Sequence, residues 1–551
     1  MLLALDSFCS KSCIFGTSLQ KKYAIEKDTA IPKKTSININ RFIPVQYYKL
    51  NMVSPIKMKK MNKDYLNEKS LDPDDWDAFN ELLYKVSDDL VEYLKNVGER
   101  PVWKSLPKDS RKLFDESLPR TGTEYAKVYD EVKQHILPYP TNNIHPRFWS
   151  WVGGTGTPSQ LIADMVISAM NSGSLGLDET ASTYVEMQLL DWLKVLLDYP
   201  TDSSGLLVSG GSMANLVGLA VARTNAAQYD VRNDGIDIKN NSRLIYYSST
   251  ETHSCIRKAM ELLGLGSESL KLIPVNNDYT INIDLLNQAI ESDIEHGNTP
   301  ACIIANVGTV NTGAIDPLIE LSKIAKKQNI WLHSDGAFGA ITKLAKKSKH
   351  LVEGMELSDS IAFDLHKWMY IQYDCGCVLI KGGAPHKETF SVIPPYIKNF
   401  ERGLASGPIN FSEYGVQLSR SFKALRAWMA LKIEGSDKFG ELVEQNINQA
   451  KYLTNLVIKN QHLEILSPTS LNIVTFRYIN KEIDENLIND FNAELLMRLH
   501  ETGKHAPSSA LLDGIFSIRV AITNHRSRLD DFNKLVDDVV IIGNNMLEDY
   551  I

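Results

Sequence analysis

The stretch of sequence that decides the fold is residues 301–339, ACIIANVGTVNTGAIDPLIELSKIAKKQNIWLHSDGAFG. It contains two short apolar runs, 301–305 and 330–333, which are separated by a segment with a helical pattern, 318–328. Strand, helix and strand in this order are typical of a parallel sheet with helices packed on it. Similar apolar runs occur at 242–247, 360–363 and 377–380. The sequence therefore predicts an α/β fold with a mainly parallel sheet that is covered on both faces.

The segment before this core has a different pattern. From Asp72 onward, apolar residues between Trp76 and Leu94 recur at steps of three and four positions. The pattern stops before Gly98 and Pro101, which are residues that commonly follow the end of a helix. We expect one amphipathic helix here, and its apolar face could pack within the chain or against a second subunit.

The segment after the core mixes helix and strand. Two strand-like runs, 472–478 and 516–522, precede a last helical pattern at 529–546, so we expect a small α+β domain. The predicted organisation has four parts: a basic, disordered extension (1–60), an N-terminal helical segment (61–150), a large α/β domain (151–445) and a small C-terminal α+β domain (446–551).

The overall composition is typical of a soluble globular protein. Of 551 residues, 43% are hydrophobic and 23% are charged, and the net charge is −8. A membrane span needs about 18 uninterrupted apolar residues, which the chain lacks, so we expect no membrane insertion. The acidic balance argues against nucleic acid as a partner. The six scattered cysteines indicate a reducing compartment and no metal site, and we expect a cytoplasmic protein.

Residues 1–60 stand apart in charge. They contain eleven basic and only three acidic residues. We expect either a disordered extension or a true start at Met52, Met58 or Met61, and an organelle-targeting peptide is the alternative.

Two charged side chains follow strand-like runs and are candidates for chemistry. Lys367 comes after the run that ends at Phe363 and is followed by the bulky Trp368. A lysine in a partly apolar pocket has a lowered pKa and can form a Schiff base with a carbonyl, although most such lysines are solvated. Asp335 ends another run and could hold a pyridine nitrogen protonated, although an acidic residue there is often only a helix cap.

Three further features suit a phosphate-bearing ring. The stretch Ser209-Gly210-Gly211-Ser212 follows a strand-like run and opens a helix, where free amides attract a single phosphate. His253 is a candidate on the same side, although a lone histidine is more often structural. Thr309, in a loop after the run 301–305, could offer a hydroxyl to the phosphate.

Together these motifs resemble the group II pyridoxal-5′-phosphate-dependent amino-acid decarboxylases, which include aromatic-L-amino-acid decarboxylase and glutamate decarboxylase. The order is Gly-Gly-Ser (210–212), His253, Asp-x-Ala (335–337) and His-Lys-Trp (366–368). Segments 145–148, 163–165 and 418–425 are also similar, and the resemblance covers roughly residues 75–545. It implies the fold type I of pyridoxal-phosphate enzymes and a homodimer whose subunits share active sites, with the N-terminal helical segment clasping the partner.

The resemblance also implies a role for each matched residue. Lys367 would carry the Schiff base with pyridoxal 5′-phosphate, and Asp335 would pair with the ring nitrogen. Ala337 and His253 would cover the two faces of the ring. The residues expected around the phosphate are Gly211, Ser212, Thr309, His366 and, from a partner subunit, Ser419. Tyr396, on a loop that closes over the substrate, would protonate the carbon that carbon dioxide leaves.

Three positions and one segment differ from the aromatic enzymes of animals and put the substrate in doubt. Gly154 and Val310 stand where those enzymes have threonine, and Asp364 stands where they have asparagine. The segment 172–177 lacks the aromatic residues that flank an aromatic substrate there.

The sequence therefore predicts decarboxylation of an L-amino acid to an amine. An aromatic substrate is favoured because Phe148, Trp149 and Trp151 precede the pocket, near Gly154, with no obvious basic clamp for a second carboxylate. Glutamate or another acidic amino acid is the alternative, supported by Arg147 and Arg402. An aldehyde-forming oxidative decarboxylase and a catalytically silent relative are further alternatives.

Overall fold

The computed structural model describes residues 69–392 and 400–550. By its contacts the chain divides into two units after Pro73, and every element below belongs to Asp74–Ile551. The predictions for residues 1–60 lie outside the described residues.

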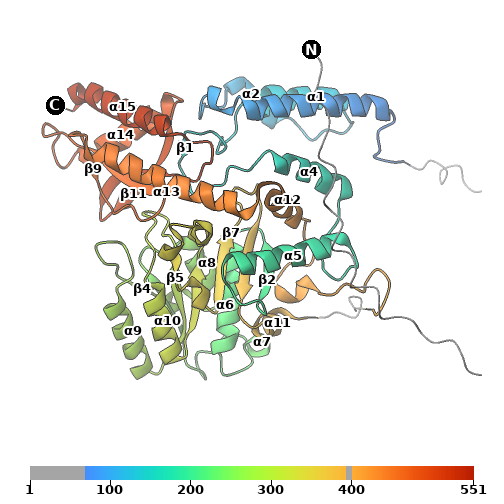
Figure 1. Ribbon diagram of the computed structural model, residues 1–551, viewed down its shortest axis with the longest axis vertical. Coiled ribbons are helices and arrows are strands. Elements are labelled where there is room, and N and C mark those ends of the chain that lie inside the picture. Colours follow the sequence, from blue (N-terminus) through green and yellow to red (C-terminus); the bar gives the residue numbers. More distant parts are fainter. Residues whose placement is uncertain (1–68, 393–399, 551) are drawn as a thin grey trace, which may run out of the picture. The chain divides into compact units, whose positions relative to one another are not determined.

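A seven-stranded sheet forms the centre of the large domain (Figure 1). The strand order is β2-β8-β7-β6-β5-β3-β4. β8 is antiparallel to both of its neighbours, and all the other pairs are parallel. The bounds are β2 Ser204–Val208, β3 Leu244–Ser249, β4 Leu270–Ile273, β5 Thr299–Asn306, β6 Trp331–Asp335, β7 Ser360–Asp364 and β8 Gly376–Ile380. The predicted α/β fold with a mainly parallel sheet is confirmed.

Most strands of this sheet are buried on both faces because helices cover the sheet. Every residue of β3, β6, β7 and β8 is buried. Helix α6, Gly211–Ala226, packs on β5, β7 and β8, and α9 and α10 pack beside β5 (Figure 1). The bounds of the latter two are Ile283–Glu295 and Leu318–Gln328, the second being the segment that the sequence predicted as helical.

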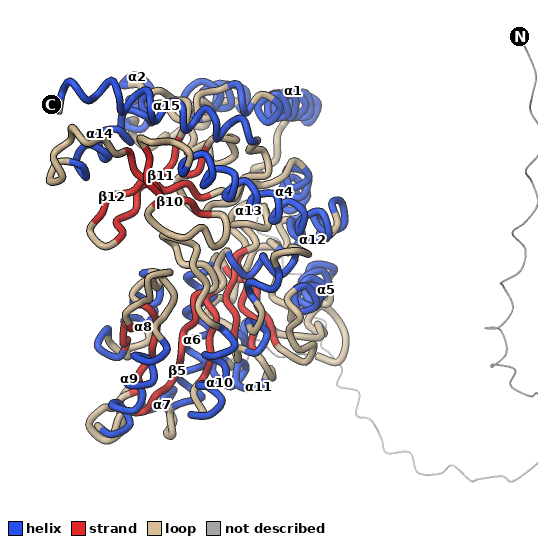
Figure 2. Tube along the Cα trace, turned by 60° about the vertical axis from the view of Figure 1, so that its left-hand side comes forward, coloured by secondary structure: helices blue, strands red, loops and turns tan. Residues whose placement is uncertain are grey.

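A second sheet lies in the C-terminal part, and Figure 2 shows it apart from the large sheet. Its order is β1-β11-β12-β10-β9, with bounds Phe148–Trp149, Ala506–Leu512, Ile515–Ala521, Ile473–Tyr478 and Leu463–Ile465. β1 joins it in parallel with β11, so residues 148–149 lie beside the C-terminal strands. The ring of Trp149 stacks on Phe532 with 5.1 Å between centroids and belongs to this domain's core.

The remaining helices flank the two sheets. Asp75 caps the first of them, accepting hydrogen bonds from the backbone N–H groups of Asp77 and Ala78. Their bounds are α1 Trp76–Lys95, α2 Lys108–Lys112, α3 Tyr125–Glu131, α4 Ser159–Met170, α5 Ala181–Leu196, α7 Val231–Asp234, α8 Ser254–Leu262, α11 Ala384–Phe390, α12 Ala424–Glu434, α13 Ser436–Ile458, α14 Ile488–Glu501 and α15 Leu529–Met546. Helix α13 runs across the domain boundary that the sequence placed at residue 445. In the described ranges no helix combines the length and apolar character needed to cross a bilayer.

Candidate active site

A cavity of about 550 Å³ lies where several strands of the large sheet end. Parallel strands bring their carboxyl ends to one edge of a sheet, where open α/β folds bind ligands. The residues that line it are Trp151, Val152, Ser209, Gly210, Gly211, Ser212, Met213, Asn215, His253, Cys255, Asn306, Gly308, Thr309, Val310, Asp335, Ala337, Phe338, Asp364, His366, Lys367, Tyr373 and Arg519. The structure thus brings together Lys367, Asp335, His253, Ala337, Gly211, Ser212, Thr309, His366 and Trp151 of the predicted site.

Lys367 reaches the cavity from the turn that follows β7. Its side chain is 25% exposed, and Nζ lies 3.1 Å from Oδ2 of Asp364. Burial alone would lower the pKa of Lys367, but the carboxylates of Asp364 and Asp335 outweigh burial and raise the pKa above its ordinary value. The expectation of a lowered pKa is wrong, because the sequence pattern revealed the apolar neighbours and not the two anions.

Asp335 is the last residue of β6 and is 6% exposed. Its Oδ1 accepts a hydrogen bond from the backbone N–H of Ala337 at 3.1 Å. Asn306 lies opposite it at the end of β5, where its amide donates to Ser249 and Asp316. Packing of the two strand ends therefore fixes a buried carboxylate at the cavity wall.

The glycine stretch forms the start of α6. The first amides of a helix have no partner within the helix, so they can donate to an anion. A Cβ on Gly211 would lie 2.8 Å from Oδ2 of Asp364 and 3.3 Å from Cβ of Ala337. Glycine is needed here because the backbone approaches those two residues closely.

His253 and Thr309 also have local structural roles. Nδ1 of His253 accepts a hydrogen bond from the backbone N–H of Cys255 at 3.2 Å and caps α8. The neutral ring must therefore carry its proton on Nε2. Burial lowers the pKa of His253, which favours that neutral form. The Thr309 hydroxyl lies 2.9 Å from that of Thr312, inside the turn after β5.

Several predicted residues lie elsewhere or cannot be placed. Trp149 belongs to the C-terminal core, where its indole N–H donates to Ser527, so the structure does not bring it into the pocket. Ser419 is exposed and does not line the cavity of its own chain. Tyr396 lies outside the described residues.

Gly154 packs on the backbone beside the lysine and does not itself line the cavity. A Cβ there would lie 1.7 Å from the carbonyl oxygen of His366, so a larger residue would require the backbone to move. With the backbone in this position, only glycine fits at residue 154.

Two residues in the cavity wall were missed by sequence reasoning. Arg519, on β12, is 4% exposed, and its Nη1 donates to the Ser150 carbonyl and the Ser508 hydroxyl, each at 3.0 Å. Its Nε and Nη2 are buried with no hydrogen-bond partner among the described residues. Tyr373 lies beside His366, with ring centroids 4.5 Å apart. Neither forms part of a recognisable motif, and Arg519 is more than 150 positions from Lys367 in the sequence.

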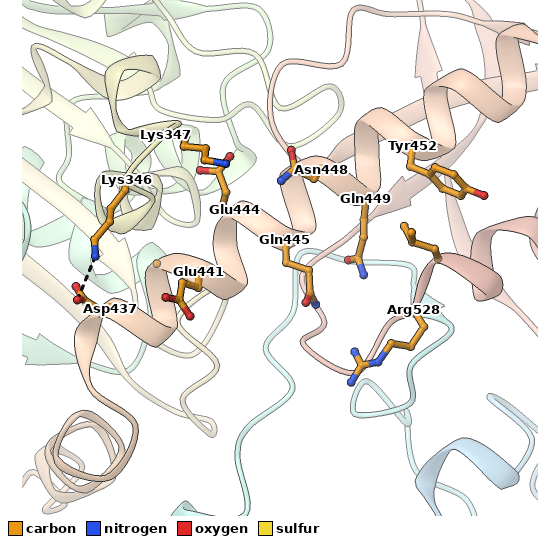
Figure 3. Close-up of a pocket in the computed structure, with 12 residues that line it drawn as sticks. Lys346, Lys347, Asp437, Glu441, Glu444, Gln445, Asn448, Gln449, Tyr452 and Arg528 are labelled. Carbon is orange, nitrogen blue, oxygen red and sulfur yellow. Dashed lines mark hydrogen bonds and ion pairs between the residues drawn. The ribbon is translucent and has the colours of Figure 1, made fainter.

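A second cavity, of about 710 Å³, lies along α13 and is drawn in Figure 3. Its wall includes Lys346 and Asp437, which form an ion pair at 3.1 Å, and Arg528 at the start of α15. None of the predicted site residues lines it.

The residues of the first cavity fit pyridoxal phosphate. Oδ1 of Asp364 and Nη2 of Arg519 are buried and have no hydrogen-bond partner in the described part of the chain, so the wall still offers polar groups to a ligand. Gly210 and Gly211 leave space at a helix N-terminus for a phosphate, Lys367 offers an amine to an aldehyde, and Asp335 offers a carboxylate to a ring nitrogen.

Comparison with known proteins agrees with this chemistry. The family described as the pyridoxal-dependent decarboxylase conserved domain matches residues 107–479. Aromatic-L-amino-acid decarboxylase of Bacillus atrophaeus is 31% identical over 463 residues, which are 84% of this chain and 94% of the relative. Phenylacetaldehyde synthase of Arabidopsis thaliana is 28% identical over 464 residues, or 82% and 93% of the two chains.

A solved structure of Oryza sativa TDC with PLP and tryptamine has the same fold. Its TM-score is 0.79 at 26% identity, and the match covers 87% of this chain and all of the other. The chain belongs to the pyridoxal-dependent decarboxylase family, as its motifs predicted. It is a carboxy-lyase with fold type I, and its cofactor is pyridoxal 5′-phosphate.

Proposed function

We propose that the protein decarboxylates an aromatic L-amino acid to the corresponding amine and carbon dioxide. The observation that carries the proposal is the similarity, over 84% and 83% of this chain, to two relatives named for aromatic substrates. The wall of the cavity supports it, because Trp151, Phe338 and Tyr373 offer ring surfaces around Lys367. Aromatic side chains pack well against such surfaces.

The predicted residues divide the work of binding and proton transfer. When bound, pyridoxal phosphate supplies an aldehyde that binds amines and a ring that takes up the electron pair left at Cα when carbon dioxide departs. Lys367 would bind the aldehyde, and Asp335 would keep the ring nitrogen protonated. Gly211, Ser212, Thr309 and His366 would hold the phosphate, while His253 and Ala337 would pack on the ring. Tyr396 would return the proton to Cα.

An acidic substrate is the second candidate, and Arg519 is the observation that favours it. Neither Arg147 nor Arg402, which supported this alternative from the sequence, lines the cavity. Arg519 does, and its unpartnered Nε and Nη2 suit a carboxylate. Binding the carboxylate that leaves would oppose its loss, so a clamp on a second carboxylate is the more productive arrangement.

Aldehyde formation is the third candidate, because phenylacetaldehyde synthases are among the similar proteins. That reaction consumes dioxygen and water with the amino acid and yields aldehyde, carbon dioxide, ammonia and hydrogen peroxide. A tyrosine at position 396 favours the amine, since relatives with an apolar residue there tend to form the aldehyde. Retained Lys367 and Asp335 argue against a catalytically silent protein.

We further propose a homodimer with shared active sites. Helix α4 supports it by leaving Ile162, Met165 and Met170 exposed by 57%, 46% and 50%. Contiguous exposed apolar side chains commonly mark an interface. Mixing inactive Tyr396→Phe and Lys367→Ala chains should restore part of the activity, because some mixed dimers would contain one intact site. Light scattering on a sizing column would measure the mass, and a monomer would overturn this proposal.

The substrate proposal is tested by incubating the holoenzyme with each of the twenty amino acids and measuring amine, aldehyde and peroxide. We expect amine from tryptophan, tyrosine or phenylalanine, and none from the Lys367→Ala control. Preferential release of amine from glutamate or aspartate, lost in Arg519→Met, would replace the aromatic assignment with the acidic one.

A further inference from the structure

Asp364 is a buried carboxylate in an unusual electrostatic position. It is 1% exposed, and its Oδ1 has no hydrogen-bond partner in the described ranges. Its Oδ2 lies 3.1 Å from Nζ of Lys367 and 3.7 Å from Nε2 of His366. Because an isolated buried anion is very costly, one of these two neighbours must balance its charge or the carboxyl must be protonated.

His366 does not supply the balancing charge. Its Nδ1 accepts a hydrogen bond from the backbone N–H of Cys375 at 3.1 Å, so the lone pair of Nδ1 is the acceptor and Nδ1 carries no proton. Burial also lowers the pKa of His366. The ring therefore stays neutral with its proton on Nε2, and Lys367 is the cation that balances Asp364.

Other titratable and charged groups also surround Lys367. Those that line the same cavity and can titrate or carry charge are Asp335, His253, Cys255, His366, Tyr373 and Arg519. Of these, Asp335 is the other carboxylate that stabilises the ammonium of Lys367. Asp364 differs from it by lying within hydrogen-bond distance of Nζ.

The pairing changes when Lys367 binds an aldehyde. An ammonium must lose a proton before its lone pair can attack, and Asp364 is the base in reach. If that proton were lost to solvent instead, an ionised Asp364 would remain beside the glycine stretch expected to hold a phosphate, since a Cβ on Gly211 would lie 2.8 Å from Oδ2. Two buried anions so close would repel each other.

We propose that Asp364 is the proton partner of Lys367. It is a carboxylate when Lys367 is a free ammonium, and it keeps the proton as a carboxylic acid while Lys367 is bonded to the cofactor. One proton moves from Nζ to Oδ2, and the two hydrogens that remain on the amine leave with the aldehyde oxygen as water when a C=N bond replaces the C=O bond. The proton returns to Nζ when the amine of Lys367 is released, so the pair stays neutral in both states. Asp364 thus acts through Lys367, as the acceptor and donor of its proton, and the inference rests on the proposed role of that lysine.

The test measures how readily Lys367 reacts in the cofactor-free protein. Trace labelling with acetic anhydride across a pH series, read by mass spectrometry of the Lys367 peptide, gives the midpoint of its titration. Asp364→Asn should lower the midpoint by at least one pH unit, so labelling at a fixed lower pH should rise about tenfold or more. The matched control is Asp374→Asn, which removes a carboxylate that also lies 3.1 Å from a lysine, Lys423.

An unchanged midpoint in Asp364→Asn, or an equal shift in Asp374→Asn, would overturn the proposal. A second measurement needs no variant: infrared difference spectra of the wild type should show a protonated-carboxyl C=O band on binding pyridoxal phosphate. Absence of that band would also overturn it. Borohydride reduction of the holoenzyme separates the proposed role of Asp364 from the proposed role of Lys367. If reduction does not attach the cofactor to Lys367, the assignment of Lys367 as the cofactor-binding lysine is wrong.

Discussion

Two lysine–aspartate ion pairs in this structure have the same separation but opposite patterns of burial. Lys367 and Asp364 are 3.1 Å apart, as are Lys423 and Asp374. In the first pair the carboxylate side chain is 1% exposed and the lysine 25%, so the anion is the buried partner. In the second the lysine is 6% exposed and the carboxylate 45%, so the buried partner is the cation.

The difference shows why distance alone does not define a functional pair. Water solvates the half-exposed Asp374 whether or not Lys423 is present, so that pair contributes little beyond local packing. Asp364 has no such access to water, and its charge depends on Lys367. Buried anions thus raise the pKa of the lysine that faces the cavity.

Replacement of Lys367 should have the largest effect. Lys367→Ala removes the amine that binds the cofactor aldehyde, so covalent attachment and turnover should both fall to background. Borohydride reduction followed by peptide mapping would measure the attachment. Retention of a reduced cofactor in the active-site peptides would show that another lysine reaches the aldehyde.

Tyr396→Phe should have the next largest effect. It tests whether Tyr396 or the ammonium of Lys367 donates the proton to Cα. If the tyrosine supplies the proton, amine formation should fall by about 10²- to 10⁴-fold while carbon dioxide release continues. The product should shift toward aldehyde, ammonia and peroxide, which coupled assays can measure. Unchanged amine output would transfer the role of acid to another group, with Lys367 as the first candidate.

Asp335→Asn tests the second carboxylate near Lys367, for comparison with Asp364. An amide cannot stabilise a protonated pyridine nitrogen, and loss of a charged hydrogen bond of about 1.5–3 kcal/mol corresponds to roughly a ten- to hundred-fold loss in rate. Covalent attachment of the cofactor should persist. Steady-state kinetics beside an absorbance spectrum would test both points, and a normal rate would place the ring partner elsewhere.

Lys423→Met should have the smallest effect and most directly tests the contrast between the pairs. Asp374 would remain hydrated, so we expect a stability loss of about 1 kcal/mol or less from the ion pair and nearly normal turnover. Urea unfolding and kinetics would measure the two quantities. A large loss of turnover with cofactor still attached would mean that both pairs support the active site.

Much of the fold could be predicted because it follows from local patterns. The segments 318–328 and 529–546 are helices with the predicted bounds. They could be predicted because the spacing of apolar residues that indicates an amphipathic helix is a local property of the sequence. The domain boundary predicted at residue 445 falls inside α13, which contributes buried side chains to both cores. A continuous helix gives no sequence pattern that marks such a division.

The sequence alone determined the α/β class and the residues that follow each strand, because strand and helix periodicity and the motifs are local properties. Lys367, Asp335 and His253 therefore came together as expected at one sheet edge. Only the tertiary structure placed Arg519 in the same wall and Trp149 in a different core, since both depend on contacts between distant segments. It also decided the ionisation of Lys367, because the pKa of a side chain depends on which charges surround it in space.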